Sequence, residues 1–327
     1  MIETPQEMRA LVHSLTTQAW TLSAIGVLFE SGLADHLAEP RSVDELALHC
    51  RSLSRGRIER CLAVAVTAGV VTAEETRYRL AEGAMPFQKQ PLRTALEGDI
   101  RTHVMQPLAF LDSAKQESKG EGWRHTDVRV LQAQGDASSA FAPMFKANIA
   151  ASMGDVAARL DRPGARLLDV GVGVGALAIA MCRAFPELGV VGLDPFEVPL
   201  GVARKNIERA GLADRIELRQ LRVEDFKDED AFDLAWLPTF FIPASVLPAA
   251  TARVRASLHP GGWVLFPVGG STGSDAQRSV SALLTELWGG PALSTAEAES
   301  LLKETGMSAV RTLPGPSWAP SMVVAQR

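Results

Sequence analysis

The most constraining feature of the sequence is an apolar segment that runs directly into three alternating glycines. It reads Leu167-Leu168-Asp169-Val170-Gly171-Val172-Gly173-Val174-Gly175, and a helix pattern follows it at residues 176–185. Glycines permit a tight turn, and because they lack side chains they let a ligand approach the backbone closely. The segment therefore predicts a strand, a ligand-binding loop and a helix in direct succession.

Short apolar runs and helix patterns alternate through the C-terminal half. A capping box of Ser294 and Glu297 opens a late helix, and Gly306 is a natural stop for it. Because strands that alternate with helices imply βαβ units, the predicted fold class is α/β with a mainly parallel sheet. The expected strands are 166–170, 190–193, 216–221, 232–236, 263–268 and 321–325, and the helices between them are 176–185, 199–210 and 244–257.

The first hundred residues read as three helices followed by a short strand pair, which is the winged-helix pattern. The helices are expected at residues 16–37, 42–50 and 54–69. A capping box of Ser42 and Glu45 opens the second helix, and residues 70–80 alternate around a polar centre as a hairpin would. Residues 91–160 then read as connecting helices, with a mobile loop at 115–122 and a long helix at 137–158.

Composition and charge exclude several classes of protein. Hydrophobic residues make up 46% of the chain, enough for a packed core, yet no apolar run reaches the roughly 18 residues of a membrane span. The N-terminus lacks the basic start of a secretory signal, and three scattered cysteines favour the cytoplasm over a disulfide or zinc site, so no metal is expected. A net charge of −5 disfavours nucleic acid as a partner.

Three acidic residues indicate what the glycine loop binds. A dinucleotide fingerprint is G-x-G-x-x-G, whereas this loop is G-x-G-x-G with Asp169 just before it. A carboxylate there would repel a pyrophosphate but suits an ammonium group, which favours a ligand with an amino-acid portion. Asp194, at the end of the next strand, can accept both ribose hydroxyls. Asp225 could accept from an adenine amino group, with Phe226 packing nearby.

With these motifs the sequence resembles the class I S-adenosylmethionine-dependent methyltransferases. The resemblance covers residues 163–327 and implies S-adenosyl-L-methionine as cofactor and a last strand that runs antiparallel. The matching segments are 167–175, Gly192-Leu193-Asp194-Pro195, Glu224-Asp225-Phe226, 232–236 and Leu258-His259-Pro260-Gly261-Gly262-Trp263. The cofactor-binding residues implied are Asp169, Gly171, Gly173, Gly175, Asp194, Pro195, Glu224, Asp225, Phe226 and Trp236.

The N-terminal half narrows the resemblance to small-molecule O-methyltransferases of secondary metabolism. In that family a winged-helix domain forms an intertwined homodimer and helps to close the substrate pocket. The resemblance implies a dimerisation domain at 1–90, connecting helices that roof the pocket at 91–160, and a cofactor-binding domain at 161–327. It also implies a small, largely apolar or aromatic acceptor.

The general-base His that members of that family carry soon after the fourth strand is missing. Residues 236–243 read Trp-Leu-Pro-Thr-Phe-Phe-Ile-Pro, without histidine or carboxylate. A phenol has a pKa of about 10, so a base within reach normally assists its methylation. Three alternatives stay open: a base from another segment, with His103 and His125 as candidates; an acceptor that needs no strong base; or a chain that has lost methyl transfer.

Apolar and aromatic residues are expected around the acceptor. Residues Phe145-Lys146-Ala147-Asn148-Ile149 resemble the family's F-N-x-x-M helix, with Ile149 in the place of its Met. For each such residue, packing in the core is the competing interpretation. The expected substrate-contacting residues are Trp123, Phe141, Met144, Phe145, Asn148, Ile149, Phe240 and Phe241.

Two other functions compete with methyl transfer. A winged-helix regulator would place the four arginines between residues 51 and 60 on DNA. Residues 1–100, however, hold ten Lys and Arg against thirteen Asp and Glu, a net charge of −3, which disfavours that function. A non-methylating relative, such as a cofactor-assisted cyclase or hydroxylase, is compatible with every motif above.

Overall fold

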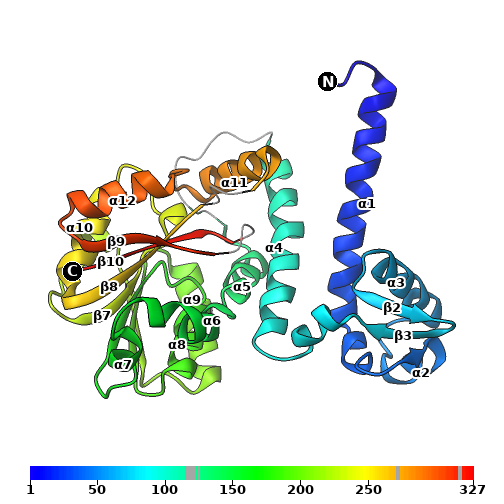
Figure 1. Cartoon of the computed structure of the whole chain (residues 1–327), viewed down its shortest axis with the longest axis horizontal. Helices are drawn as coiled ribbons and strands as arrows, with labels where there is room; N and C mark the ends of the chain where they lie inside the picture. The colour runs from blue at the N-terminus through cyan, green and yellow to red at the C-terminus, as the bar shows by residue number, and fades with distance from the viewer. Residues whose placement is uncertain (115–122, 124, 270–272, 316–318) are drawn as a thin grey trace. The chain divides into compact units, whose positions relative to one another are not determined.

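The chain forms two compact units, Met1–Gln116 and Glu117–Arg327. The computed structural model describes residues 1–114, 123, 125–269, 273–315 and 319–327, and Figure 1 shows the elements of each unit. The mobile loop expected at 115–122 lies outside the described residues.

The first unit combines helices with a small antiparallel sheet of strand order β1-β3-β2. The hairpin expected near residues 70–80 is confirmed, because β2 and β3 pair from Val71 opposite Leu80 to Glu74 opposite Arg77. Leu28, Leu46 and Leu62 are among the fully buried residues of its core. The elements are α1 (Pro5–Glu30), η1 (Leu33–His36), β1 (Arg41–Ser42), α2 (Val43–His49), α3 (Arg55–Thr67), β2 (Val71–Glu74), β3 (Arg77–Leu80), η2 (Glu82–Gln88) and α4 (Leu92–Ser113).

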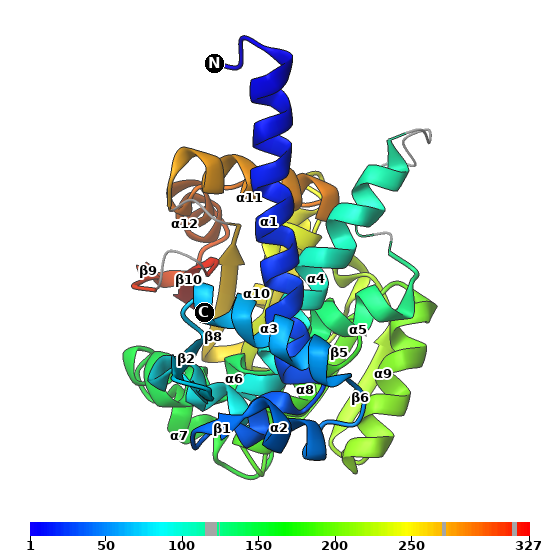
Figure 2. The ribbon, with the colours of Figure 1, turned by 90° about the vertical axis from the view of Figure 1, so that its right-hand side faces the viewer.

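The first helix differs from the expected range of 16–37 at both ends. A capping box sets the start of α1: the Thr4 hydroxyl accepts from the Glu7 N–H, and the Glu7 carboxylate accepts from the Thr4 N–H. Gly32, with φ of 78°, lies in the left-handed region just beyond its end. The helices α2 and α3 gather around the C-terminal half of α1, and the N-terminal half extends beyond them (Figures 1 and 2).

The second unit is built on a seven-stranded sheet of order β6-β5-β4-β7-β8-β10-β9. The pairs among β6, β5, β4, β7 and β8 are parallel, whereas β10 is antiparallel to both of its neighbours. This confirms the predicted fold class and the antiparallel last strand. The strands are β4 (Arg166–Val170), β5 (Gly189–Asp194), β6 (Ile216–Gln220), β7 (Phe232–Trp236), β8 (Leu258–Val268), β9 (Ser308–Leu313) and β10 (Ser321–Gln326).

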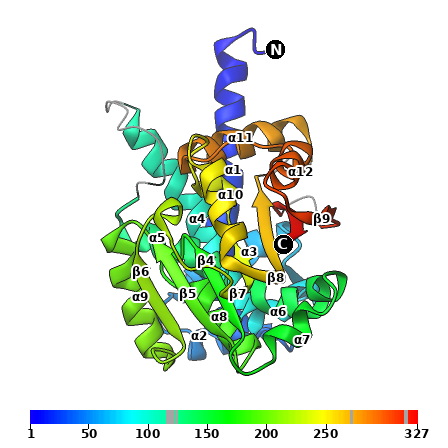
Figure 3. The same cartoon turned by 90° about the vertical axis from the view of Figure 1, so that its left-hand side faces the viewer.

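Helices cover both faces of this sheet, as Figures 1 and 3 show. Successive residues of β4 point to opposite faces, so Leu167 packs in one core cluster with α8 and α9, and Leu168 in the other with α10 and α12. Both clusters are almost wholly apolar, which explains why the central strands read as continuous apolar runs. The helical elements are α5 (Val128–Ala137), α6 (Phe141–Met144), η3 (Phe145–Ile149), η4 (Ala150–Ser152), α7 (Val156–Leu160), α8 (Ala176–Ala184), α9 (Glu197–Ala210), η5 (Val223–Asp225), η6 (Thr239–Phe241), α10 (Leu247–Ser257), α11 (Asp275–Trp288) and α12 (Thr295–Glu304).

Two expected elements of this unit need correction. The helix expected at 137–158 is instead a series of short pieces that includes a π-helical turn at Phe145–Ile149. Pro143 removes a backbone donor there, and Gly154, with φ of 63°, lies in the left-handed region that helices avoid. The strand expected at 263–268 begins earlier, at Leu258, which already pairs with Phe232 of β7. The pairing shifts register before Trp263, where Gly261 adopts φ of 78°, and this irregularity hides the first part of the strand in the sequence.

No helix in the described part of the chain is both long and apolar enough to span a membrane.

Candidate functional site

The glycine loop connects β4 to α8 in a conformation that requires its glycines. Gly171, Gly173 and Gly175 have φ of 71°, 55° and 79°, a region that L side chains rarely adopt. The N–H groups of Gly171 and Val172 both donate to the Leu193 carbonyl, at 2.8 and 2.9 Å. The loop is therefore tied to the end of β5, and no side-chain hydrogen bond caps the first turn of α8 behind it.

Asp169 is the central carboxylate of the site. It lies in β4 directly beside Gly192 of β5 and Trp236 of β7, and its side chain is buried. Its Oδ2 atom has no hydrogen-bond partner among the described residues. Burial, with a smaller contribution from the charge of Asp194, raises the pKa of the Asp169 carboxyl to about 7. A buried carboxylate oxygen without a partner is costly, so this atom indicates a position for a cationic or hydrogen-bonding ligand group.

Asp194 links the end of β5 to the glycine loop. Its carboxylate is 7% exposed and accepts from Gly173 N–H at 3.1 Å and from Phe196 N–H at 2.9 Å. Burial raises the pKa of this carboxyl to about 6, although both backbone hydrogen bonds oppose the shift. Each oxygen accepts one backbone N–H and keeps a further lone pair, so the group can still accept two hydroxyls.

The residues expected at the adenine and near Asp194 lie in different environments. Asp225 ends η5 with an exposed side chain, and the neighbouring Glu224 pairs with Arg222 at 2.7 Å. Phe226 is fully buried in the core, with its ring 5.9 Å from that of Phe232. Pro195 is exposed directly after Asp194.

An aromatic cluster follows the end of β7. The ring of Phe241 lies 5.2 Å from Trp123 and 5.2 Å from Trp288, and Phe240 contacts both Phe241 and Trp288. Sequence reasoning missed Trp288, which lies at the end of α11. The small residue Gly290 marks its position, because a Cβ there would come within 2.5 Å of the Phe240 backbone. A ligand beside this cluster would meet flat aromatic faces and edges.

The remaining residues expected at the acceptor divide between exposed and packed positions. Phe141 is half-buried, and its ring lies 4.8 Å from that of Trp236. Phe145 is fully buried against Phe185, whereas Ile149 is partly buried in the same cluster. Met144 and Asn148 are exposed. Lys146, which differs from the family's Asn, donates to Asp161 at 3.0 Å and to the Ala184 carbonyl at 2.8 Å.

The stretch after β7 supplies no acid or base. Its one hydroxyl, that of Thr239, is fully buried and donates to the Pro267 carbonyl at 2.9 Å. His125 is half-buried 4.6 Å from the Trp123 ring, and burial lowers the pKa of its imidazole, so the neutral form is favoured at neutral pH. His103 lies on α4 in the first unit, with Nδ1 2.7 Å from the Asp99 carbonyl.

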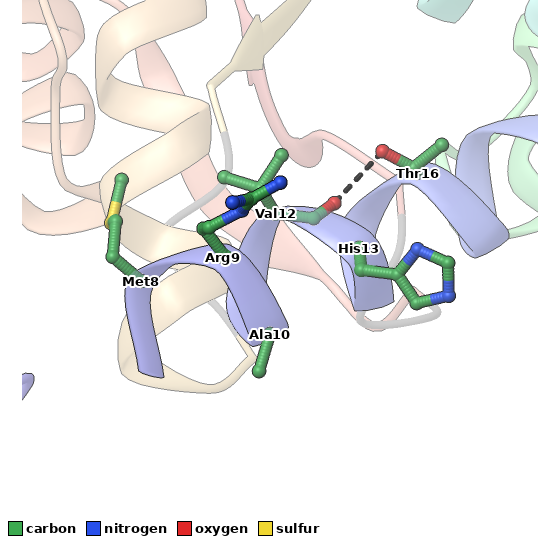
Figure 4. A pocket seen from close by; sticks show the side chains of 6 residues that line it. All are labelled: Met8, Arg9, Ala10, Val12, His13 and Thr16. Atoms are coloured by element: carbon green, nitrogen blue, oxygen red, sulfur yellow. Dashed lines mark hydrogen bonds between the residues drawn. The ribbon is translucent and has the colours of Figure 1, made fainter. Parts of the chain in front are cut away.

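A hollow away from these residues lies on one face of α1 (Figure 4). It has a volume of about 580 Å³, and none of the expected site residues lines it. Its lining residues are Met8, Arg9, Ala10, Val12, His13 and Thr16. No group of three or more His, Cys, Asp or Glu in the described segments is arranged to hold a metal ion.

Comparisons with known proteins agree with this geometry. Residues 167–262 match the family model of a methyltransferase domain. The chain is 39% identical over 121 residues to a release factor glutamine methyltransferase of Gloeobacter violaceus, and 33% identical over 160 residues to a ubiquinone biosynthesis O-methyltransferase of Paracidovorax citrulli. These alignments cover 36% and 47% of this chain, and 40% and 61% of the respective relatives, so the chain spans less than two thirds of either.

Among solved structures, human N-acetylserotonin methyltransferase in complex with S-adenosylmethionine superposes with a TM-score of 0.64. The match covers 100% of this chain and 99% of that one at 16% identity, so it shows a shared fold. The family match shows a methyltransferase domain over residues 167–262, and the structural match shows that the whole chain shares the fold of this methyltransferase. An O-methyltransferase family protein from Burkholderia thailandensis shares this fold as well, with a TM-score of 0.65 at 17% identity over 100% of this chain and 99% of that one.

Proposed function

We propose that this chain transfers a methyl group from S-adenosyl-L-methionine to O, N or C of a small, largely apolar or aromatic acceptor of the natural-product kind. The observation that carries the proposal is the unpartnered, buried Oδ2 of Asp169 beside the glycine loop. A ligand ammonium group would satisfy that atom, and S-adenosyl-L-methionine carries one. The loop and Asp194 then present backbone and carboxylate acceptors to the rest of the cofactor.

The chain's own groups would mainly bind and orient the reactants. Asp169 would hold the amino-acid end of the cofactor, Asp194 the ribose and Asp225 the adenine. When bound, the cofactor would supply an electrophilic methyl group on a sulfonium. The aromatic cluster of Trp123, Phe240, Phe241 and Trp288 would align a flat acceptor and exclude water.

The direct test of methyl transfer uses the full chain with S-adenosyl-L-methionine and a panel of aromatic acceptors. Mass spectrometry is expected to show acceptors heavier by one methyl, together with S-adenosylhomocysteine. Failure of the protein to bind either form of the cofactor would contradict the proposal. The residues after β7, which include no acid or base, favour one second candidate, a non-methylating relative. Cofactor binding with no methylated product across the panel would support that candidate.

His125 is the proposed base where the acceptor needs one. Its lowered pKa leaves the imidazole free to take a proton at neutral pH. For a hydroxyl acceptor, His125→Gln is expected to lower kcat by about 100-fold, with cofactor affinity unchanged. His259→Gln, a substitution in β8, is the matched control and should leave kcat unchanged. An unaltered rate in His125→Gln would remove His125 from this role.

We also propose a cytoplasmic homodimer formed by the winged-helix-like residues 1–90, with residues 91–160 as the bridge and 161–327 as the cofactor-binding domain. An apolar stripe on α1 at helical spacing supports the dimer: Met8, Leu11, Val12 and Leu15 are all exposed in the single chain. The three cysteines are free thiols, in keeping with a reducing compartment. On α3, Arg55 already pairs with Asp44 and Glu59, which weakens the case for DNA binding.

Charge placed on the α1 stripe should separate the protomers. Leu15→Asp is expected to convert the dimer to a monomer of 35.0 kDa, because a carboxylate would have to be buried without a partner. Light scattering after size-exclusion chromatography measures the mass. Thr17→Asp adds the same charge on the opposite face of α1 and should stay dimeric. A Leu15→Asp variant that keeps the dimer mass would show that this stripe is not the interface.

A further inference from the structure

A side-chain network on the protein side of the glycine loop connects the loop to two helices. Asn206 of α9 donates from Nδ2 to the Val174 carbonyl at 3.0 Å and to Gln132 Oε1 at 3.0 Å. Gln132 lies on α5 and donates from Nε2 to Asp136 Oδ1 at 2.7 Å. The side-chain amide of Asn206 thus donates one hydrogen bond to the loop and the other to α5.

Close packing joins α5 to the same point of the loop. The Val174 side chain is 3% exposed and lies against Gly135 of α5. A Cβ at Gly135 would come within 2.2 Å of Val174 Cγ2, so no side chain fits at position 135. The contact between α5 and the loop is therefore both hydrogen-bonded and sterically close, and the two observations are independent.

The Val174 carbonyl is the loop atom that a side chain from outside the loop holds. It lies between Gly173 and Gly175, whose φ angles of 55° and 79° place both in the left-handed region. Within the loop, Gly175 N–H, which belongs to the same peptide as the Val174 carbonyl, donates to the Val172 carbonyl at 2.9 Å. The bond from Asn206 adds a constraint from α9, and on the other side Gly173 N–H donates to Asp194.

We propose that Asn206 and Gln132 are positioning residues for the cofactor loop, and that they couple the loop to α5, so that cofactor binding stabilises both. This inference rests on the proposed cofactor site. Because coupling between two sites is reciprocal, a cofactor that fixes the loop also stabilises α5, and loss of the network weakens the cofactor. Neither residue touches the cofactor in this proposal.

The test measures S-adenosylhomocysteine affinity by calorimetry and amide hydrogen exchange of residues 128–137 in the full chain. Asn206→Asp keeps the shape but replaces the donor with an acceptor, so affinity is expected to fall about tenfold. In the wild type, S-adenosylhomocysteine should slow exchange in α5, whereas in Asn206→Asp it should not. Lys205→Ala, at the exposed neighbouring position on α9, is the control and should behave as wild type.

Gln132→Ala breaks the link between the loop and α5 but leaves the loop's own hydrogen bond in place. Because the bond from Asn206 to the Val174 carbonyl remains, most of the affinity for S-adenosylhomocysteine should remain. The protection of α5 against hydrogen exchange should be lost. This variant decides the question if Asn206→Asp fails to fold. The inference would be overturned if S-adenosylhomocysteine still slowed hydrogen exchange in α5 of Gln132→Ala as it does in the wild type. It would also be overturned if a folded Asn206→Asp bound S-adenosylhomocysteine with unchanged affinity. A wild-type protein that binds no S-adenosylhomocysteine would instead overturn the proposed function.

Discussion

Asp194→Ala is expected to abolish binding of S-adenosyl-L-methionine and to leave the dimer intact. The substitution removes the proposed acceptor of two ribose hydroxyls and also the partner of Gly173 N–H, so the proposed ribose site and the loop would be weakened together. Hydrogen bonds to a charged group contribute about 1.5–3 kcal/mol each, which corresponds to an affinity loss of about 100-fold or more. Calorimetric titration with the cofactor measures the loss, and light scattering reports the dimer.

Two further variants sharpen this prediction. Asp194→Asn keeps one accepting oxygen and should fall between the wild type and Asp194→Ala. Glu208→Ala removes an exposed carboxylate from α9 and should bind as the wild type does. If Asp194→Ala binds the cofactor with unchanged affinity, the assignment of Asp194 to the ribose is wrong.

Cofactor affinity is expected to rise steeply between pH 5 and pH 8. Burial raises the pKa of Asp169 to about 7 and that of Asp194 to about 6, so the ligand-free protein holds protons on both at acidic pH. Asp169 must be ionised to attract an ammonium group. At pH values below the pKa of a carboxyl that must lose its proton on binding, cofactor affinity rises by up to about tenfold for each pH unit, and each such carboxyl adds its own factor. Titrations in buffers of different ionisation enthalpy should show that binding releases protons.

Asp169→Asn isolates the contribution of the central carboxylate. The amide cannot ionise, so this variant should bind weakly at pH 8 and lose the part of the pH dependence that lies near pH 7. A variant with the full wild-type pH profile would show that Asp169 does not titrate on binding.

The same two carboxyls affect stability without cofactor. Their pKa values in the folded protein lie above the ordinary value of 3.8 for an aspartate, so between about pH 4 and pH 7 the unfolded chain holds fewer protons than the folded one. Their contribution to the free energy of unfolding therefore falls as pH rises through this window. Asp169→Asn should accordingly lose less stability than the wild type between pH 5 and pH 8, measured by thermal denaturation.

The sheet and the cofactor loop could be predicted because their signals are local. β4 and β7 have the bounds expected from sequence, since both strands are buried on two faces and read as short apolar runs. The start of α1 was wrongly expected at residue 16, although Thr4 and Glu7 have the spacing of a capping box and Pro5 is the first helical residue. Nor was β9 expected from the sequence. It lies at the edge of the sheet, where most of its side chains are exposed or half-buried and form no apolar pattern.

The parts of the site that sequence reasoning missed depend on pairing across long separations. Trp288 joins Phe240 and Phe241 because α11 packs on η6, and the nearby Gly290 indicates that close approach only once the structure is known. The network of Gln132, Asn206 and Val174 likewise brings three separate elements together. The unpartnered Oδ2 of Asp169 is also a three-dimensional property, although the position of Asp169 before the glycines marked it as a candidate.

The most direct test of the central claim is a crystal structure of the full chain bound to S-adenosylhomocysteine. We expect the ligand at the glycine loop, with its amino group at Asp169 and its ribose hydroxyls on Asp194. A ligand bound elsewhere, or one that leaves the Asp169 and Asp194 carboxylates without contact, would contradict that claim.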